Sequence, residues 1–320
     1  MASFIICEPR KENKQNQTMF NKYLFSSEYQ SSVINQPDPM GPIVFIIPPH
    51  VFTFNYVNQI GSGVYGKVYH FYENIYKINI AIKCCKNNKE EKIAEDLCNS
   101  DCKTLLSKPA GVSLYVNGNL ENHCIFMELA EGTLRKYFTK LNSASLSVYE
   151  LHKKILSIAE EVRQQMVCIY NLNNNYVYTD LKLDNVLYKC DDRKKLDQVR
   201  ILLGDLGSAI KDDHNEYIAT YPPYEYRYSN GFILLDTERK KLDTMAWQLG
   251  VLLLSIYHGN KPEFVELQYN EIDVIDFFGH DTFIKLYEYM EVSYGPDIAR
   301  LLAEDPNNRR SILDPIPIPP

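Results

Sequence analysis

The stretch Gly61-Ser-Gly-Val-Tyr-Gly-Lys-Val68 lies between two segments whose composition predicts β-strands, Phe52–Ile60 and Lys67–Phe71. Three glycines allow a backbone to approach phosphate groups closely, because no side chain intervenes. The same glycine spacing belongs to a dinucleotide-binding unit only when a helix follows directly. Here a β-branched strand follows, so the stretch favours a glycine-rich flap between two strands. An ordinary hairpin turn is the alternative that these residues leave open.

The strands and helices expected around this stretch occur in separate blocks. Apolar alternation predicts strands over Ile78–Cys84, Val112–Val116 and His123–Glu128, with a helix over Lys89–Leu106 between them. Helical periodicity then dominates, as in Ser147–Leu172 and a later segment, 244–257. The separation of strands from helices indicates an α+β fold with two lobes. We expect a small antiparallel β lobe with one helix and a larger, mainly helical lobe.

The composition divides the chain into three parts. Residues 1–50, rich in Asn, Gln and Ser, are expected to form an N-terminal extension. Residues 51–314 are expected to form the domain, with a small lobe over 51–130 and a large lobe over 131–314. Residues 315–320 form a Pro-rich tail. The extension could be a docking arm for a substrate, a brace on the small lobe, or a disordered segment.

The overall composition is that of a globular protein, since 45% of the 320 residues are hydrophobic and 23% are charged. A net charge of −7 argues against electrostatic binding of nucleic acid. No apolar run reaches the length of a membrane helix, so no membrane partner is expected, and no secretory signal is evident. None of the eight cysteines forms a C-x-x-C pair. We therefore expect reduced thiols and an intracellular location, cytoplasmic or nuclear.

Three further motifs place polar side chains next to predicted strands. Ile80-Ala-Ile-Lys83 puts a lysine at the end of an apolar strand, shortly after the glycine stretch. Tyr178-Thr-Asp-Leu-Lys-Leu-Asp-Asn185 holds an acid, a base and an amide that converge if the backbone makes a tight loop. In Leu203-Gly-Asp-Leu-Gly207 an aspartate follows an apolar strand, which suits a Mg²⁺ ligand. A solvated polar turn is the alternative for each loop taken alone.

The four motifs, in this order and spacing, resemble those of the eukaryotic-type protein kinase family over residues 52–313. The resemblance extends to Pro222-Pro-Tyr-Glu225, to the segment 246–250, and to Asp305-Pro-Asn-Asn-Arg309. In the family the last arginine pairs with the glutamate, which implies an ion pair between Glu225 and Arg309. The abundance of residues with AT-rich codons suggests a divergent, viral or parasite kinase, which in the viral case would act in a host cell.

The resemblance implies a serine/threonine kinase that uses ATP and Mg²⁺, with Mn²⁺ as an alternative metal. In such an enzyme Asp180 accepts the substrate proton, Lys182 stabilises the transferring phosphoryl group and Lys83 holds the ATP phosphates. Asn185 and Asp205 are the implied metal ligands. The remaining residues implied to line the ATP site are Ile60, Gly61, Gly63, Gly66, Val68, Met127, Glu128 and Ala130.

The acid that pairs with Lys83 has to come from the helix that follows it. On a 3.6-residue wheel one stripe runs from Ala94 to Leu105, and Asp101 is the acid within it. Asp101 is therefore the predicted partner, with Glu95 as the fallback. The alternative is that Asp101 is simply solvated.

Three departures from the family bear on how the site is held together. Thr179 stands in place of an arginine that contacts a phosphate in the family, so we expect activity without activation-segment phosphorylation. Leu206 replaces a phenylalanine but is still apolar, so we expect it to pack inside. Met245 occupies the position of a family aspartate. Either Asp243 substitutes for that aspartate, or the catalytic loop is held in another way.

Three functions are compatible with the motifs. The main prediction is an active serine/threonine kinase with protein substrates, and Asp184 allows for targets with basic residues near the hydroxyl. The second is a pseudokinase, a nucleotide-binding or protein-interaction module without turnover. A small-molecule phosphotransferase is the third, which Lys182 and Arg309 disfavour because they serve kinases of peptide substrates.

Overall fold

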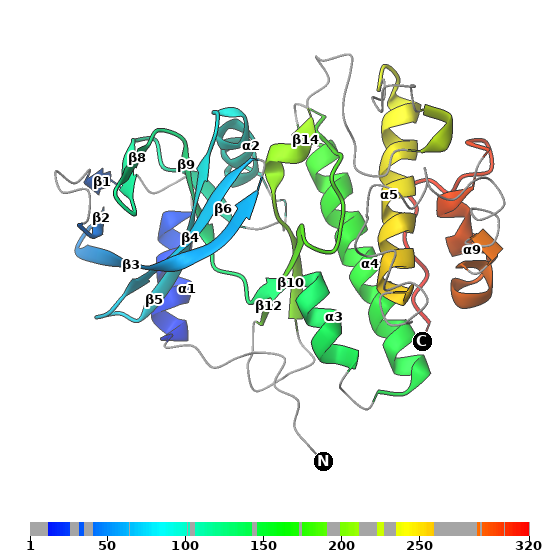
Figure 1. The fold of residues 1–320 in the computed structure, drawn as a ribbon, viewed down its shortest axis with the longest axis horizontal. Helices are drawn as coiled ribbons and strands as arrows, with labels where there is room; N and C mark the ends of the chain where they lie inside the picture. Colours follow the sequence, from blue (N-terminus) through cyan, green and yellow to red (C-terminus); the bar gives the residue numbers. More distant parts are fainter. Residues whose placement is uncertain are drawn as a thin grey trace. The chain divides into compact units, whose positions relative to one another are not determined.

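The computed structural model describes residues 12–25, 32–34, 41–63, 65–100, 102, 106–142, 146–172, 175–190, 199–210, 223–226, 235–258, 287–288, 290–303 and 305–319. These residues form two compact units (Figure 1). The strand-rich unit contains the described residues up to Glu131 together with Asp205–Gly207. The helical unit contains the described residues of Gly132–Gly204 and Ser208–Pro320. The α+β fold with a small β lobe and a larger helical lobe is confirmed.

The strand-rich unit is built on an antiparallel sheet in the order β1-β2-β3-β4-β5-β9-β6. Its strands are β1 (Ser32–Ile34), β2 (Ile43–Ile47), β3 (His50–Gly63), β4 (Gly66–Glu73), β5 (Ile78–Cys85), β6 (Ser107–Pro109) and β9 (Cys124–Glu128). A separate hairpin is formed by β7 (Leu114–Val116) and β8 (Asn119–Glu121). Burial alternates along β2, as expected for one covered face. Strand β5 is buried at every position, so both of its faces are covered.

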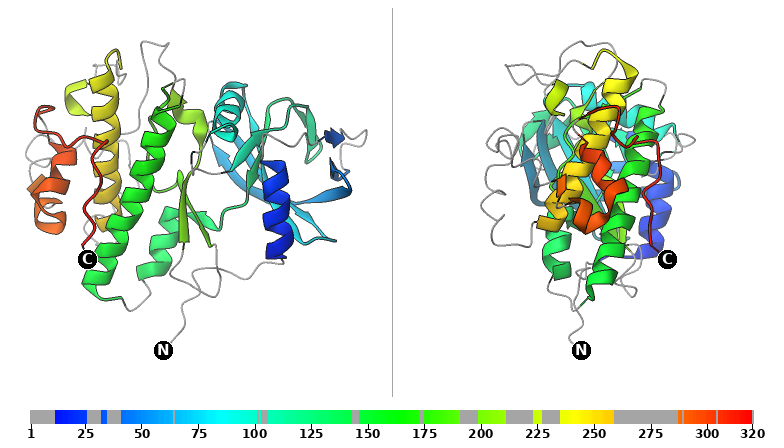
Figure 2. Two further views of the ribbon diagram at one scale, coloured as in Figure 1. Left: turned by 180° about the vertical axis from the view of Figure 1, so that it is seen from behind. Right: turned by 90° about the vertical axis from the view of Figure 1, so that its right-hand side faces the viewer.

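Helix α1 (Lys14–Leu24) makes part of the expected extension an integral element of this unit. It lies beside β5 (Figures 1 and 2). Phe20 is fully buried, and its ring packs edge-on against Phe52 at 4.9 Å between centroids. The side-chain amide of Gln17 donates to the carbonyl of Asn79 and accepts from its N–H, at 3.0 and 2.7 Å. Of the three roles considered for residues 1–50, a brace describes this helix.

The helix after β5 is shorter than the sequence predicts. Helix α2 spans Lys89–Cys98, whereas the prediction ran to Leu106, which lies just before β6. The side-chain amide of Asn99 donates to the Glu95 carbonyl at 3.0 Å, and the Ser100 hydroxyl donates to the Leu97 carbonyl at 2.9 Å. Polar side chains that bond the last carbonyls compete with continuation of a helix, which explains the early end.

The helical unit begins with a small sheet and two helices. Strands β10 (Gly132–Thr133), β12 (Val186–Cys190) and β13 (Val199–Leu203) pair antiparallel, as do β11 (Val177–Tyr178) and β14 (Ala209–Ile210). The helices that follow β10 are α3 (Leu134–Asn142) and α4 (Val148–Tyr170). A capping box starts α4, because Ser147 and Glu150 bond each other's backbone amides.

Helix α5 (Glu238–His258) runs beside α4 (Figure 2). The later described elements are the short turns η1 (Leu206–Ser208) and η2 (Tyr224–Tyr226), helix α9 (Pro296–Ala299) and the turn η4 (Arg300–Leu302). Helix α5 packs closely against η4, since a Cβ at Gly250 would lie 2.7 Å from Cγ of Leu302. The side chain of Trp247 is fully buried in this helix.

The described part of the chain bears on two further expectations, the absence of a membrane-spanning helix and the state of the cysteines. No helix there is long and apolar enough to cross a membrane. The expectation of reduced thiols holds for Cys84, Cys85, Cys98 and Cys124, but is wrong for the three cysteines that form disulfides, Cys102, Cys168 and Cys190. Partner choice among distant cysteines depends on the tertiary fold, which spacing alone does not reveal.

Phe20→Ala tests whether α1 is a structural part of the strand-rich unit. Loss of this buried ring should lower the free energy of unfolding by about 3–5 kcal/mol. Urea unfolding gives the value, with Thr18→Ala on the exposed side of the same helix as the control, expected to change it by under about 0.5 kcal/mol. Equal and small effects of both substitutions would show that α1 does not brace the sheet.

Candidate active site

Lys83 is buried in β5 and makes two ion pairs within the strand-rich unit. Its Nζ lies 2.6 Å from Oε1 of Glu90 and 2.6 Å from Oδ1 of Asp205. The lysine and glutamate side chains are 7% and 5% exposed, so water screens this pair little. Two carboxylates around one ammonium leave a surplus negative charge at this position.

The partner of Lys83 differs from the predicted one. Glu90 occupies the position expected for Asp101, which lies outside the described residues, and the fallback Glu95 is exposed on α2. The link between β5 and α2 is short, so the first turn of α2 is the part of the helix that meets Lys83.

The sequence did carry a signal for Glu90. The buried face of α2 consists of Glu90, Ile93, Ala94 and Leu97, which is the i, i+3, i+4, i+7 pattern of one helical stripe. A stripe that starts at the first helical turn therefore contains the glutamate, whereas the stripe used in the prediction continued beyond the end of the helix.

The two carboxylates change the pKa of Lys83. Burial by itself would lower the pKa of Lys83, but the carboxylates of Glu90 and Asp205 outweigh it, and the pKa is raised. Lys83 is therefore a cation at neutral pH. The second oxygen of Glu90 accepts a hydrogen bond from the Cys85 thiol at 3.4 Å, so both oxygens of the carboxylate are oriented.

The segment Asp205–Gly207 is fixed against the first turn of α2. Asp205 has a left-handed backbone, with φ of 48°, and Leu206 is buried as expected. Nζ of Lys89 donates to the Gly207 carbonyl at 3.2 Å. A Cβ at Gly207 would lie 3.1 Å from both Oε2 of Glu90 and the side chain of Tyr65, so little space remains for a larger residue.

The glycine stretch forms the end of the β3–β4 hairpin, as predicted, with Gly63 opposite Gly66. Only Gly66 is required sterically, because a Cβ there would fall 2.1 Å from the Cys84 carbonyl oxygen. A Cβ at Gly63 would meet nothing within 4 Å, and at Gly61 it would make ordinary contact with Val68. The sheet therefore explains Gly66, whereas Gly61 and Gly63 leave room for a ligand to approach.

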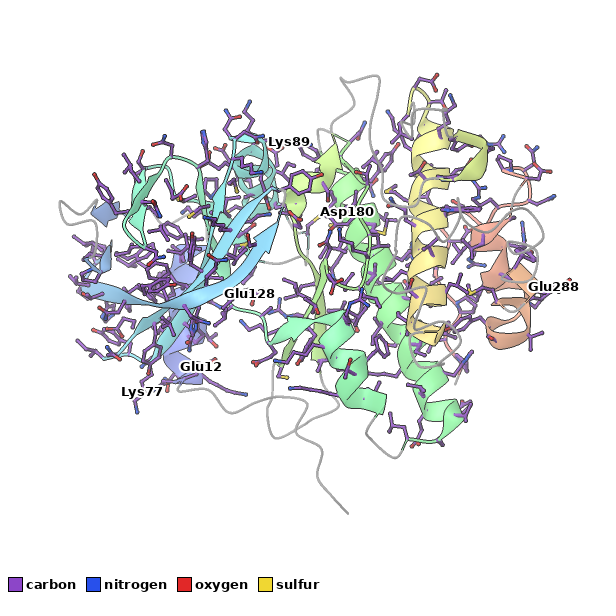
Figure 3. All side chains as sticks on the ribbon, viewed as in Figure 1. Glu12, Lys77, Lys89, Glu128, Asp180 and Glu288 are labelled. Atoms are coloured by element: carbon purple, nitrogen blue, oxygen red, sulfur yellow. The ribbon has the colours of Figure 1, made fainter. Side chains whose placement is uncertain are left out.

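The other residues implied to line an ATP site lie on neighbouring strands of the same sheet. Val68 on β4 is opposite Lys83, and Ile60 on β3 is about half exposed. Met127 on β9 is opposite Ala81 of β5. Glu128, labelled in Figure 3, directs both its N–H and its carboxylate to Leu106. Ala130 lies two residues after the end of β9.

In the helical unit the loop between β11 and β12 brings together Asp180, Lys182 and Asn185, as the sequence predicts. Asp180 is labelled in Figure 3. Nζ of Lys182 lies 3.0 Å from Oδ2 of Asp180. The side-chain amide of Asn185 donates to the same oxygen at 2.7 Å and to the Asp180 carbonyl at 2.8 Å. The backbone N–H of Asn185 closes the turn on the Lys182 carbonyl.

Hydrogen bonds from uncharged side chains to backbone carbonyls also hold this loop in place. The hydroxyl of Tyr178 donates to the Gly204 carbonyl at 2.6 Å, and that of Thr179 donates to the Ser208 carbonyl at 2.7 Å. The fully buried side chain of Gln248 on α5 donates to the Thr179 carbonyl at 2.7 Å. Gln248 carries no signal in the sequence, because nothing local links it to a loop so distant in the chain.

Asp243 does not take the role of the missing family aspartate. Its carboxylate accepts a hydrogen bond from the Tyr226 hydroxyl at 2.7 Å. The loop of Asp180 is therefore held in another way, which is the second of the two alternatives stated above. The predicted ion pair of Glu225 and Arg309 is confirmed, at 2.5 Å. Arg309 also bonds the Ala303 carbonyl and lies over the ring of Trp247, which fixes it in the helical unit.

The strand-rich unit thus carries a buried lysine between two carboxylates, and the helical unit carries an aspartate bonded to a lysine and an asparagine. Residues 54–314 match the family described as "Protein kinase domain". The chain belongs to the protein kinase family, a family of phosphotransferases that in general use ATP and a divalent metal.

Two curated relatives are similar to this chain. Each is named "Dual specificity tyrosine-phosphorylation-regulated kinase mbk-2", one from Caenorhabditis briggsae and one from Caenorhabditis elegans. Both are 24% identical over 240 residues, which is 69% of this chain and 26% of the relative. The chain thus spans about a quarter of the length of these relatives. A solved structure, "ROP18 kinase domain in complex with AMP-PNP and sucrose", is similar with a TM-score of 0.47 and 16% identity, covering 95% of this chain and 92% of that one.

Glu90→Gln tests the assignment of the Lys83 partner. The substitution keeps the size of the side chain but removes the buried negative charge, so the free energy of unfolding should fall by about 1–3 kcal/mol in urea denaturation. Glu95→Gln, an exposed position on the same helix, is the matched control and should change it by under about 0.5 kcal/mol. The assignment is wrong if the Glu95 substitution proves as destabilising as the Glu90 substitution.

Proposed function

We propose that this protein is a serine/threonine protein kinase, which transfers the γ-phosphoryl group of ATP to hydroxyls of protein substrates. The observation that carries the proposal is the buried Lys83 between Glu90 and Asp205. Glu90 and Asp205 hold the ammonium of Lys83 in a fixed position, from which it would contact the phosphates of a nucleotide. The loop of Asp180, Lys182 and Asn185 supports the second part of the proposal, transfer to a hydroxyl.

The donor atoms fit Mg-ATP. Asp205 offers a carboxylate, and its surplus negative charge beside Lys83 suits a divalent cation. The amide nitrogen of Asn185 is used on Asp180, which leaves its oxygen as the atom suited to a metal. Asp205 and Asn185 would hold Mg²⁺, or alternatively Mn²⁺, and the bound metal would offset the charge of the phosphates. Lys83 would hold the phosphates from the side of β5.

Apolar residues on the sheet would contact the nucleotide base. Ile60, Val68 and Met127 would line the adenine site, and the backbone of Glu128 and Ala130 would bond its edge. Gly61 and Gly63 would allow the flap to cover the phosphates, since neither carries a side chain that would intervene.

Asp180 would accept the proton of the acceptor hydroxyl as its oxygen attacks the γ-phosphorus. The bond from that phosphorus to the bridging oxygen of the β-phosphate would break, and ADP would leave. Asn185 orients the carboxylate through Oδ2, and Lys182 lies at the same oxygen. The ammonium of Lys182 would also stabilise negative charge on the transferring phosphoryl group. Positioning and charge stabilisation account for most of the catalysis in this class of reaction.

The choice of acceptor and the regulation are further parts of the proposal. The Asp180-Leu-Lys182 pattern favours serine and threonine, whereas the relatives are named as dual-specificity kinases. Thr179 bonds the Ser208 carbonyl directly, so the loop would not depend on a phosphate for its position. We place the enzyme inside the cell, in the cytoplasm or nucleus, with protein substrates.

Transfer of radiolabelled γ-phosphate from Mg-ATP to mixed proteins tests the proposal, with protein treated beforehand with phosphatase. Asp180→Asn should lower the transfer rate by about 10²–10⁴-fold through loss of the base, and Lys83→Met should abolish transfer by weakening nucleotide binding. Asp314→Asn, an exposed aspartate, is the control and should retain the wild-type rate. Phosphoamino acid analysis of the products separates serine and threonine from tyrosine.

Two outcomes contradict the proposal. Stabilisation of the wild-type protein by Mg-ATP without any transfer would mean a nucleotide-binding pseudokinase. A wild-type rate in Asp180→Asn would mean that another group is the base.

A further inference from the structure

Asp184 is an exposed acid in the same loop as the proposed base. It lies four residues after Asp180, and its side chain is 44% exposed. A carboxylate at this place would attract cationic side chains of a bound target segment, because exposed charges of opposite sign attract over several ångströms. Its effect on target choice therefore depends on which charges already surround it.

Arg135 already binds Asp184 through a two-pronged contact. Nε donates to Oδ1 at 2.9 Å and to Oδ2 at 3.1 Å, and Nη2 donates to Oδ2 at 2.8 Å. Both carboxylate oxygens accept from the one guanidinium, which is the most specific geometry for such a pair. The side chain of Arg135 is 32% exposed, so the pair lies at the surface.

The backbone fixes Arg135 in this position. Arg135 is in the first turn of α3, and its N–H donates to the carbonyl of Leu183, next to Asp184, at 3.3 Å. Thr133, just before α3, is opposite Leu187, just after the loop, in the β10–β12 pair. The guanidinium and the carboxylate are thus brought together by two backbone connections and not by side-chain flexibility alone.

Each of the two aspartates in the loop pairs with one basic side chain. Lys182 pairs with Asp180, and Arg135 pairs with Asp184. The described loop therefore presents no net acidic charge near the proposed base, although its sequence contains two aspartates close together.

We propose that Arg135 is a specificity-determining residue, which cancels the charge of Asp184 so that the enzyme accepts hydroxyl targets with uncharged flanks. The inference rests on the proposed kinase function and differs from the expectation that Asp184 selects basic residues. The substrate class is thus protein segments in which the serine or threonine has no basic neighbours.

The test compares two labelled peptides with one serine each, flanked by alanines or by arginines. Binding is measured by fluorescence anisotropy and transfer by kcat/KM. The proteins compared are the wild type, Arg135→Gln, Arg135→Lys, Asp184→Asn and the double substitution Arg135→Gln with Asp184→Asn. Arg135→Gln should raise the ratio of basic to neutral peptide about fivefold, the size of an exposed ion pair. The gain should shrink as salt is added.

The other variants show whether the effect depends on the charges of Arg135 and Asp184. Arg135→Lys keeps the positive charge, so its ratio should stay near that of the wild type, and the double substitution should lose the gain. An unchanged ratio in Arg135→Gln would overturn the proposal. So would a wild-type preference for the basic peptide that Asp184→Asn removes, because Asp184 would then select basic residues despite Arg135.

The two readouts separate this inference from the function it rests on. A protein that transfers phosphate to neither peptide would contradict the proposed function. The anisotropy ratios would still decide for or against the role of Arg135, because binding does not require transfer.

Discussion

The ion pair of Lys83 with Glu90 is the interaction on which the organisation of the strand-rich unit depends. A buried ammonium is costly unless it is paired, and here two carboxylates pair with it. The short link from β5 to α2 forces the first turn of the helix onto Lys83, which explains why Glu90 is the partner. Lys83, which Glu90 holds in place, bonds Asp205, and Lys89 in the first turn of α2 bonds the Gly207 carbonyl. One helical turn thus fixes both the lysine and the aspartate of the candidate site.

The loop of Asp180 in the helical unit is held together in a different way. The charged groups, Asp180 and Lys182, form an ion pair within the loop. Uncharged side chains hold the loop itself in place. Gln248 and Thr179 supply two of these bonds, each to a backbone carbonyl. Neutral side chains hold the loop without adding a further charge beside Asp180. The ion pair of Glu225 and Arg309 lies apart from this loop in the sequence and anchors the end of the unit.

Local patterns were sufficient to predict the glycine hairpin, Lys83 at the end of its strand, and the convergence of Asp180 with Asn185, because each depends on residues close in sequence. Glu90 was missed because the end of α2 depends on Asn99 and Ser100, and the choice of helical stripe depends on where the helix begins and ends. Helix α1 was missed because its single buried face is short and polar residues surround it. Gln248 could not be predicted, since its contact with Thr179 joins segments that only the tertiary fold brings together.

A double-mutant cycle on Lys83 and Glu90 tests the central claim most directly. Unfolding free energies of Lys83→Met, Glu90→Gln and the double variant give the coupling between the two side chains. Residues in direct contact should couple by about 1–3 kcal/mol, whereas a parallel cycle of Lys83→Met with Glu95→Gln should give less than about 0.5 kcal/mol. Coupling to Glu95 as large as that to Glu90, or no coupling to Glu90, would contradict the account.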